Sequence, residues 1–217
     1  MKDNEIPAAL SLIRKAVKAW QTPAVTIVAR EKDPYKVLVS CILSLRTQDR
    51  TTGEASARLF GLAGTPKAML RLSGSEIERA IYPVGFYRNK AKAILAISRI
   101  LLDVYGGAVP ADIDELLKLP GVGRKTANLV VTIGYGRPGI CVDTHVHRIT
   151  NRWGYVVTKT PEQTEYALRA KLPKRYWITI NDLLVTFGQN QCKPTSPICS
   201  TCVVYKYCDR VGVTRQR

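Results

Sequence analysis

The sequence is short of acidic residues and contains no long apolar run. Asp and Glu number 17 among its 217 residues, whereas Lys and Arg number 33, which gives a formal net charge of +16. No stretch approaches the roughly 20 consecutive apolar residues that a membrane-spanning helix requires. The N-terminal stretch carries charges where a secretory signal would have its apolar core. A cytoplasmic protein is therefore expected.

The excess of positive charge points to an anionic partner. Basic residues are spread along the chain and are not gathered in one tail, which favours a basic surface on a folded domain. Such a surface is typical of proteins held near phosphates or anionic lipid. A basic surface that is merely solvated is the alternative. The chain is 46% hydrophobic, and its length allows one large core or two small ones.

Strand-like alternation is also scarce. The segment "PAVTIVAR", residues 23 to 30, is the one ambiguous case. Elsewhere apolar residues recur at helical spacing between capping signals, and the clearest amphipathic run, from Tyr87, closes at Gly106 and Gly107. The pattern predicts an all-α fold of about ten short helices. No low-complexity segment or internal repeat interrupts it.

A glycine-rich turn, "LPGVGR", joins a short helix near 112–118 to a helix from about 122 to 134. Backbone N–H groups in such a turn, at a helix N-terminus, form an anion-binding concavity, and glycine lets a phosphate approach closely. A nucleotide-binding P-loop is excluded because Arg124 stands before Lys125 where that motif requires glycine. The alternative is an ordinary helix–turn–helix without a ligand.

Two residues near this turn could carry chemistry. The amine of Lys125, when neutral, can attack a sugar carbon and form a Schiff base. The carboxylate of Asp143, in "VDTHVHRITNRWG", can stabilise the positive charge that develops as a glycosidic bond breaks. Together they suit removal of a base followed by cleavage of the strand. An Asp before a helical run is also the usual N-cap, so a purely structural Asp143 is the alternative.

The cysteines near the C-terminus form the most specific pattern. Their spacing is C-x6-C-x2-C-x5-C, formed by Cys192, Cys199, Cys202 and Cys208. Disulfides are not expected in a reducing compartment, and four close thiolates there indicate a metal site. Zinc and a [4Fe–4S] cluster both accept four cysteines. Only one CxxC pair is present, which favours the cluster. Cys41 and Cys141 lie in apolar runs and are expected in the core.

In this order, "LPGVGRKTAN", "VDTHVHRITNRWG" and the cysteine pattern resemble the endonuclease III family of base-excision repair enzymes, which are helix-hairpin-helix glycosylases. The resemblance covers roughly residues 30 to 208. It implies two helical lobes with a DNA-binding cleft between them. A six-helix barrel domain with the hairpin would span 27–137. A discontinuous domain with a [4Fe–4S] cluster would comprise 1–26 and 138–217.

The resemblance also implies the activity. The protein would be a bifunctional glycosylase and abasic-site lyase that removes oxidised pyrimidines from duplex DNA. Lys125 would be the nucleophile and Asp143 the catalytic carboxylate. The protein would act near the nucleoid on damaged or abasic double-stranded DNA. A monomer is the default expectation. The hairpin amides that would face DNA are those of Gly121, Val122 and Gly123, and the cluster ligands would be Cys192, Cys199, Cys202 and Cys208.

Two positions depart from the family pattern. Arg46 stands where the family often has the glutamine that fills the space left by the flipped base, and Gln48 follows two residues later. Either side chain could fill that space. Phe86 stands where the family has a wedge leucine; a phenylalanine can also wedge between bases, and a helix-packing aromatic is the alternative. Lys193, beside the first cluster cysteine, is a candidate phosphate contact.

Two other functions compete with this interpretation. The first is a monofunctional glycosylase directed at mismatched or adenine bases; related enzymes of that kind lack the lysine, so Lys125 argues against it. The second is a non-catalytic DNA-binding module that uses only the hairpin and the cluster. The joint presence of Lys125, Asp143 and four cysteines argues against that function.

Overall fold

The structure is a computed structural model that describes residues 1–20, 24–29 and 31–217. These residues form twelve α-helices and no strand, so the predicted all-α class is confirmed. The segment that the sequence left ambiguous is helical over Ala24–Ala29, whereas Pro23 and Arg30 lie outside the described residues. None of the described helices combines the length and the apolarity needed to cross a membrane.

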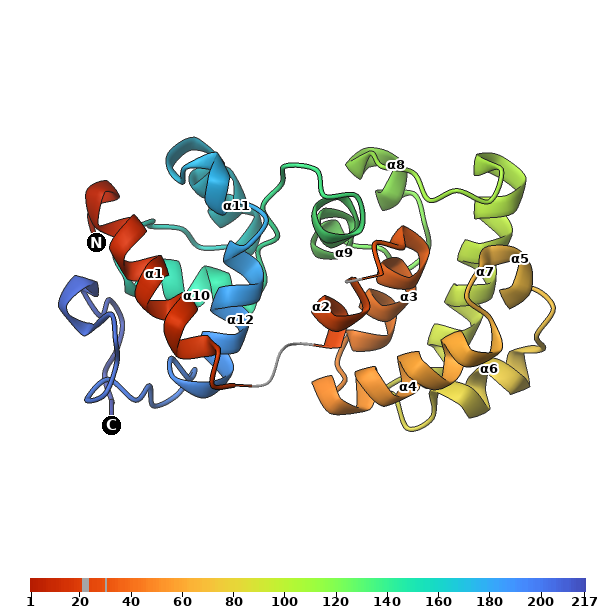
Figure 1. The fold of residues 1–217 in the computed structure, drawn as a ribbon, viewed down its shortest axis with the longest axis horizontal. Helices are drawn as coiled ribbons and strands as arrows, with labels where there is room; N and C mark the ends of the chain where they lie inside the picture. Colours follow the sequence, from red (N-terminus) through yellow and green to blue (C-terminus); the bar gives the residue numbers. More distant parts are fainter. Residues whose placement is uncertain (21–23, 30) are drawn as a thin grey trace. The chain divides into compact units, whose positions relative to one another are not determined.

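The chain divides into two compact units (Figure 1). One consists of Met1–Pro23 together with Pro138–Arg217, and the other is the continuous segment Ala24–Arg137. The expected boundary after residue 26 falls inside helix α2 (Ala24–Ala29). This helix belongs to the continuous unit because it packs on α3 and α4, and because the Asp49 carboxylate accepts the Ala24 N–H at 2.9 and 3.0 Å.

Helix α3 is the centre of the continuous unit. Asp33 caps its first turn by accepting the N–H groups of Tyr35 and Lys36, and the helix is then buried from Tyr35 to Leu43, apart from the half-buried Lys36. Four helices and a π-helical turn surround it, which explains its almost entirely apolar sequence. These elements are α3 (Pro34–Ser44), α2, α4 (Asp49–Leu62), α7 (Tyr87–Tyr105), α9 (Arg124–Leu129) and η2 (Val130–Gly134).

Local capping chemistry sets the remaining boundaries of this unit. Ser73 and Glu76 form a reciprocal capping box at the start of α6, and α7 ends at Gly106, whose φ is +61°. Helix α6 packs on α7 and α4, and α5 packs on α7. The short elements are α5 (Pro66–Met69), α6 (Gly74–Ile81) and α8 (Ile113–Leu117).

The discontinuous unit has its own core. Helix α12 packs on α10 and α1, and the buried rings of Trp153 and Phe187 fill the centre. The N-terminus is tied into this core, since the Met1 amine donates to the Trp153 carbonyl at 2.7 Å and to Asp209 Oδ2 at 2.9 Å. Its elements are η1 (Asp3–Glu5), α1 (Ile6–Val17), α10 (Thr144–Arg152), α11 (Pro161–Lys171), η3 (Lys174–Tyr176), α12 (Ile180–Asn190) and η4 (Tyr205–Tyr207).

Candidate functional site

The glycine turn lies between α8 and α9, as the sequence predicts. Gly121 has a φ of +75°, a conformation that favours glycine, and Gly123 is the N-cap of α9. Both glycines are exposed, whereas Val122 is buried and donates its N–H to the Leu119 carbonyl at 3.1 Å. Of the three expected DNA-facing amides, that of Val122 is therefore already engaged within the turn, and Val122 serves to anchor it.

Lys125 is the second residue of α9 and is exposed. Its helix packs on α3, and its charge acts on the buried thiol of Cys41. Burial raises the pKa of that thiol to about 12, against the opposing influence of the Lys125 ammonium. Gly121 lies over Ile42, where an added Cβ would be 3.9 Å from Ile42 Cδ1. The hairpin and Lys125 thus both lie next to the C-terminal half of α3.

Asp143 is the N-cap of α10 and is 8% exposed. Its Oδ1 accepts the N–H groups of His145 and Val146, both at 2.9 Å. Asp143 therefore does have the N-cap role that was the alternative to catalysis. Both capping bonds use the same carboxylate oxygen, Oδ1. Asp143 belongs to the discontinuous unit and Lys125 to the continuous one.

Arg46 and Phe86 share an uncommon backbone conformation. Their φ values are +52° and +58°, in a region that bulky residues rarely occupy and that costs about 1–3 kcal/mol for each. Both side chains are exposed, and the Arg46 guanidinium carbon lies 5.7 Å from the centre of the Phe86 ring, within cation–π range. The sequence named both residues, and the structure brings them together. Gln48 is exposed at the N-cap of α4, with no capping bond from its side chain.

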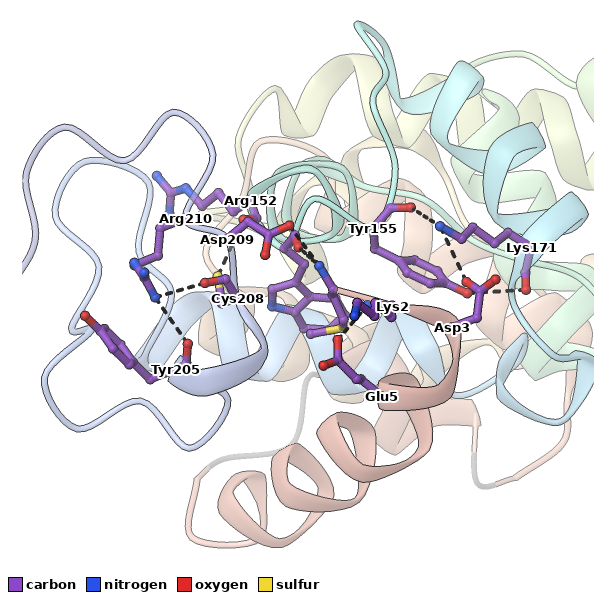
Figure 2. A network of polar contacts seen from close by, with 12 residues as sticks. Lys2, Asp3, Glu5, Arg152, Tyr155, Lys171, Tyr205, Cys208, Asp209 and Arg210 are labelled. Atoms are coloured by element: carbon purple, nitrogen blue, oxygen red, sulfur yellow. Dashed lines mark hydrogen bonds and ion pairs between the residues drawn. The ribbon is translucent and has the colours of Figure 1, made fainter.

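The four cysteines line one pocket in the discontinuous unit. Its apolar walls include Trp153 and Phe187. Arg152 Nη1 donates to Cys192 Sγ at 3.4 Å and to the carbonyl of Lys193 at 2.7 Å (Figure 2 shows Arg152 and Cys208). The side chain of Lys193 is exposed. The cysteines are Cys192, Cys199, Cys202 and Cys208.

Burial disfavours thiolates in this pocket. It raises the pKa of Cys202 to about 11 and also raises the pKa values of Cys199 and Cys208, and charges on neighbouring thiolates add to the effect. Backbone N–H groups of Val204 and Arg210 donate to Cys202 and Cys208 and act in the opposite direction.

The N–H groups that donate to the cysteine sulfurs suit an iron–sulfur cluster, which is held by cysteine thiolates and tuned by hydrogen bonds to sulfur. Within residues 1–20, 24–29 and 31–217, no three Cys, His, Asp or Glu side chains are grouped around the position of a single metal ion. Cys41 and Cys141 are buried, as expected from their apolar surroundings.

Lys90, on α7 of the continuous unit, lies beside the loop that carries Arg46, and the sequence alone did not point to it. It is only 7% exposed, and its Nζ donates to Leu43 O at 2.9 Å, to Leu45 O at 2.5 Å and to Thr47 Oγ1 at 3.1 Å. Burial lowers its pKa to about 8. A signal was available, because Lys90 continues the apolar stripe of Ile94 at helical spacing.

An all-α fold with a glycine hairpin opening a helix and a four-cysteine pocket is that of a helix–hairpin–helix DNA-repair protein. Comparison with known proteins agrees. Residues 39–174 match the family model described as HhH-GPD superfamily base excision DNA repair protein. Endonuclease III of Thermotoga maritima is 48% identical over 180 residues, which cover 83% of this chain and 84% of that protein. Endonuclease III of Escherichia coli is 36% identical over 176 residues, covering 81% and 83%.

Solved structures give the same result. A non-covalent endonuclease III–DNA complex matches with a TM-score of 0.85 at 34% identity, covering 97% of this chain and 96% of the other. A trapped endonuclease III–DNA covalent intermediate matches with a TM-score of 0.83 at 33% identity, covering 97% of both. The chain belongs to the endonuclease III family, and the predicted membership is confirmed. It is a DNA glycosylase and abasic-site lyase of base excision repair.

A thermostable thymine-DNA glycosylase also matches, with a TM-score of 0.74 at 23% identity. At that identity the likeness shows a shared fold alone.

Proposed function

We propose that this protein removes oxidised pyrimidines from duplex DNA and cuts the strand at the resulting abasic site, with Lys125 as the nucleophile. The observation that carries the proposal is the exposed Lys125 directly after the glycine hairpin. Support comes from the 48% identity to an endonuclease III and from the match to a trapped covalent endonuclease III–DNA intermediate.

The reaction runs through an amine. Lys125 Nζ, in its neutral form, attacks C1′ of the damaged nucleotide, and the bond between C1′ and the base breaks, with the electron pair leaving on the base. Loss of a proton and opening of the sugar ring give a Schiff base between Nζ and C1′. Removal of a proton from C2′ then expels the 3′ phosphate by β-elimination, which cuts the strand. Hydrolysis of the imine releases Lys125.

Asp143 supports the charge that develops on the sugar as the base leaves. Its two capping bonds, to His145 and Val146, fix the orientation of the carboxyl group against the first turn of α10. The structural and the catalytic interpretations are therefore compatible, because a carboxylate held by its own helix is already oriented before DNA binds.

The hairpin holds DNA by its backbone. Gly121 and Gly123 present an exposed peptide surface at the start of α9, which suits a phosphate and carries no sequence information. The net charge of +16 adds a non-specific attraction to the duplex. Damaged double-stranded DNA is thus the partner that fits both features.

The cofactor that fits the cysteine pocket is a [4Fe–4S] cluster, held by Cys192, Cys199, Cys202 and Cys208. When bound, it supplies four metal–thiolate bonds, which cross-link the loop that runs from α12 to η4. Arg152 connects this loop to α10, since its guanidinium donates to Cys192 and to the Lys193 carbonyl. The cluster would thereby brace the helix that begins at Asp143.

Borohydride trapping tests the proposed nucleophile. The substrate is duplex DNA with one thymine glycol, and the wild type is compared with Lys125→Gln and with Lys92→Gln, which changes an exposed lysine on α7. We expect a covalent band for the wild type and Lys92→Gln and none for Lys125→Gln, whose DNA binding stays nearly intact. A band that persists in Lys125→Gln would overturn the assignment. A wild-type band on abasic DNA alone would retain the lyase and overturn the lesion class.

A further inference from the structure

Lys90 joins two segments that lie far apart in the sequence. It is the fourth residue of α7, whereas its acceptors, Leu43 O, Leu45 O and Thr47 Oγ1, all belong to the end of α3 and the loop after it. An ammonium has three N–H donors, so these bonds use all of them. A buried lysine thus binds the inner side of the loop that presents Arg46.

The same two segments meet at Gly85. Its N–H donates to Thr47 Oγ1 at 3.2 Å, and an added Cβ would lie 2.7 Å from the Arg46 carbonyl oxygen. The segment before α7 therefore lies against the backbone of Arg46 with no room for a side chain. Phe86 follows at once, with its ring beside the Arg46 guanidinium.

Lys90 and Gly85 thus lie next to Arg46 and Phe86. These two are the only non-glycine residues with positive φ among the described residues between positions 33 and 209. Residues held in such conformations persist when the surrounding contacts over-determine them, and they occur at ligand-contacting sites. Here part of the contacts that hold these two residues come from the opposite segment: Lys90 and Gly85 bond to the loop around Arg46, and the Phe86 ring lies beside the Arg46 guanidinium. Neither loop is fixed by its own sequence alone.

From this geometry we infer that Lys90 is a positioning residue, which holds Arg46 and Phe86 together as one two-pronged element that contacts the base pair at the lesion. The inference rests on the proposed function, because it takes these two side chains to face DNA. Lys90 itself touches no substrate. Its role is to fix the spacing between the two side chains, and this spacing determines which opposite base is accepted.

The test compares Lys90→Met, which keeps an unbranched side chain one atom shorter and removes its donors, with Lys92→Met, the same change at an exposed site of α7. Three quantities are measured in each. They are the single-turnover rate of thymine glycol release opposite adenine and opposite guanine, the cleavage rate of a preformed abasic site, and the amide hydrogen exchange of residues 43–48.

For Lys90→Met we expect faster exchange in residues 43–48, a rate of base release lowered about tenfold or more, and a smaller difference between the opposite bases. Cleavage of the preformed abasic site, which needs no base to be displaced, should change much less. Lys92→Met should behave as the wild type. A general loss of folding would instead lower all rates together without changing the preference for the opposite base.

A double-mutant cycle with Phe86→Ala separates the remaining explanations. If Lys90 acts by placing Phe86, its removal should have little further effect on base release in the Phe86→Ala background. Fully additive losses, or unchanged exchange and base preference in Lys90→Met, would overturn the inference. An inactive wild type would instead count against the proposed function, and the hydrogen-exchange comparison would still test the contact between the two segments.

Discussion

Replacing Gly85 by alanine should destabilise the continuous unit and impair base release. The added Cβ would lie 2.7 Å from the Arg46 carbonyl oxygen, 3.5 Å from Thr47 Oγ1 and 3.7 Å from the Arg46 carbonyl carbon. Two of these three atoms are backbone, so relief requires the loop after α3 to move. That loop is also held by Lys90, which resists the movement.

The magnitude follows from the cost of overpacking a fitted contact, about 1–3 kcal/mol. For a chain of this length, this corresponds to a fall in Tm of about 2–4 °C per kcal/mol. The assay is thermal unfolding followed by circular dichroism, together with single-turnover release of thymine glycol. Base release should fall more than the loss of stability explains, because the displaced backbone atoms belong to Arg46 itself.

Gly61→Ala is the matched control. Gly61 lies within α4, and a Cβ added there meets no atom within 4 Å. The same substitution should therefore leave base release unchanged and stabilise the helix by about 0.5–1 kcal/mol. A Gly85→Ala protein that melts with the wild type and releases base at the same rate would refute the reasoning. The loop would then tolerate a displacement that the described contacts forbid.

The remaining predictions concern a carboxylate, a thiolate and the buried lysine. Asp143→Asn keeps a good N-cap but removes the negative charge, so single-turnover base release should slow by about 10²–10³ while the Tm changes little; an unchanged rate would remove Asp143 from the reaction. Cys202→Ser should lower the iron content from the roughly four atoms per chain of a [4Fe–4S] protein and bleach its visible absorption; a colourless wild type with stoichiometric zinc would contradict the cluster. Lys90 has a folded pKa of about 8, below its usual 10.5, so only the unfolded chain binds its proton between these pH values. The stability of the wild type relative to Lys90→Met should therefore rise as pH increases from about 8 to about 10.5, measured by denaturant unfolding; a falling difference would reverse the sign of the pKa shift.

Features set by neighbouring residues were predictable from the sequence. Gly106 closes α7, as its place after the amphipathic run predicts, because it acts within one turn of chain. The cysteine spacing is equally local, and its four members line one pocket, although no three of them are grouped around a single metal-ion position among the described residues.

Features that depend on distant segments were not predictable. The apolar run at Ala24–Ala29 fits a strand or a buried helix equally well, and its packing on α3 and α4 decides for the helix. Lys90 looked like one more basic residue on an amphipathic helix, because its acceptors are 43 to 47 positions away. The sequence named Arg46 and Phe86 separately, and no local pattern predicts the contact between their side chains.

The proposed roles place affinity and selectivity in different parts of the continuous unit. The hairpin presents glycine backbone, which can bind a phosphate of any nucleotide, so changes at Gly121 or Gly123 should alter binding similarly for all duplexes. The pair formed by Arg46 and Phe86 presents a cation and an aromatic ring on strained backbone. Lys90 holds the loop on either side of Arg46 by its hydrogen bonds to Leu45 and Thr47. Only such a shaped and fixed surface can respond differently to two opposite bases, because discrimination requires a difference in contact energy between them. Substitutions that alter base preference without altering affinity should therefore lie in this second group.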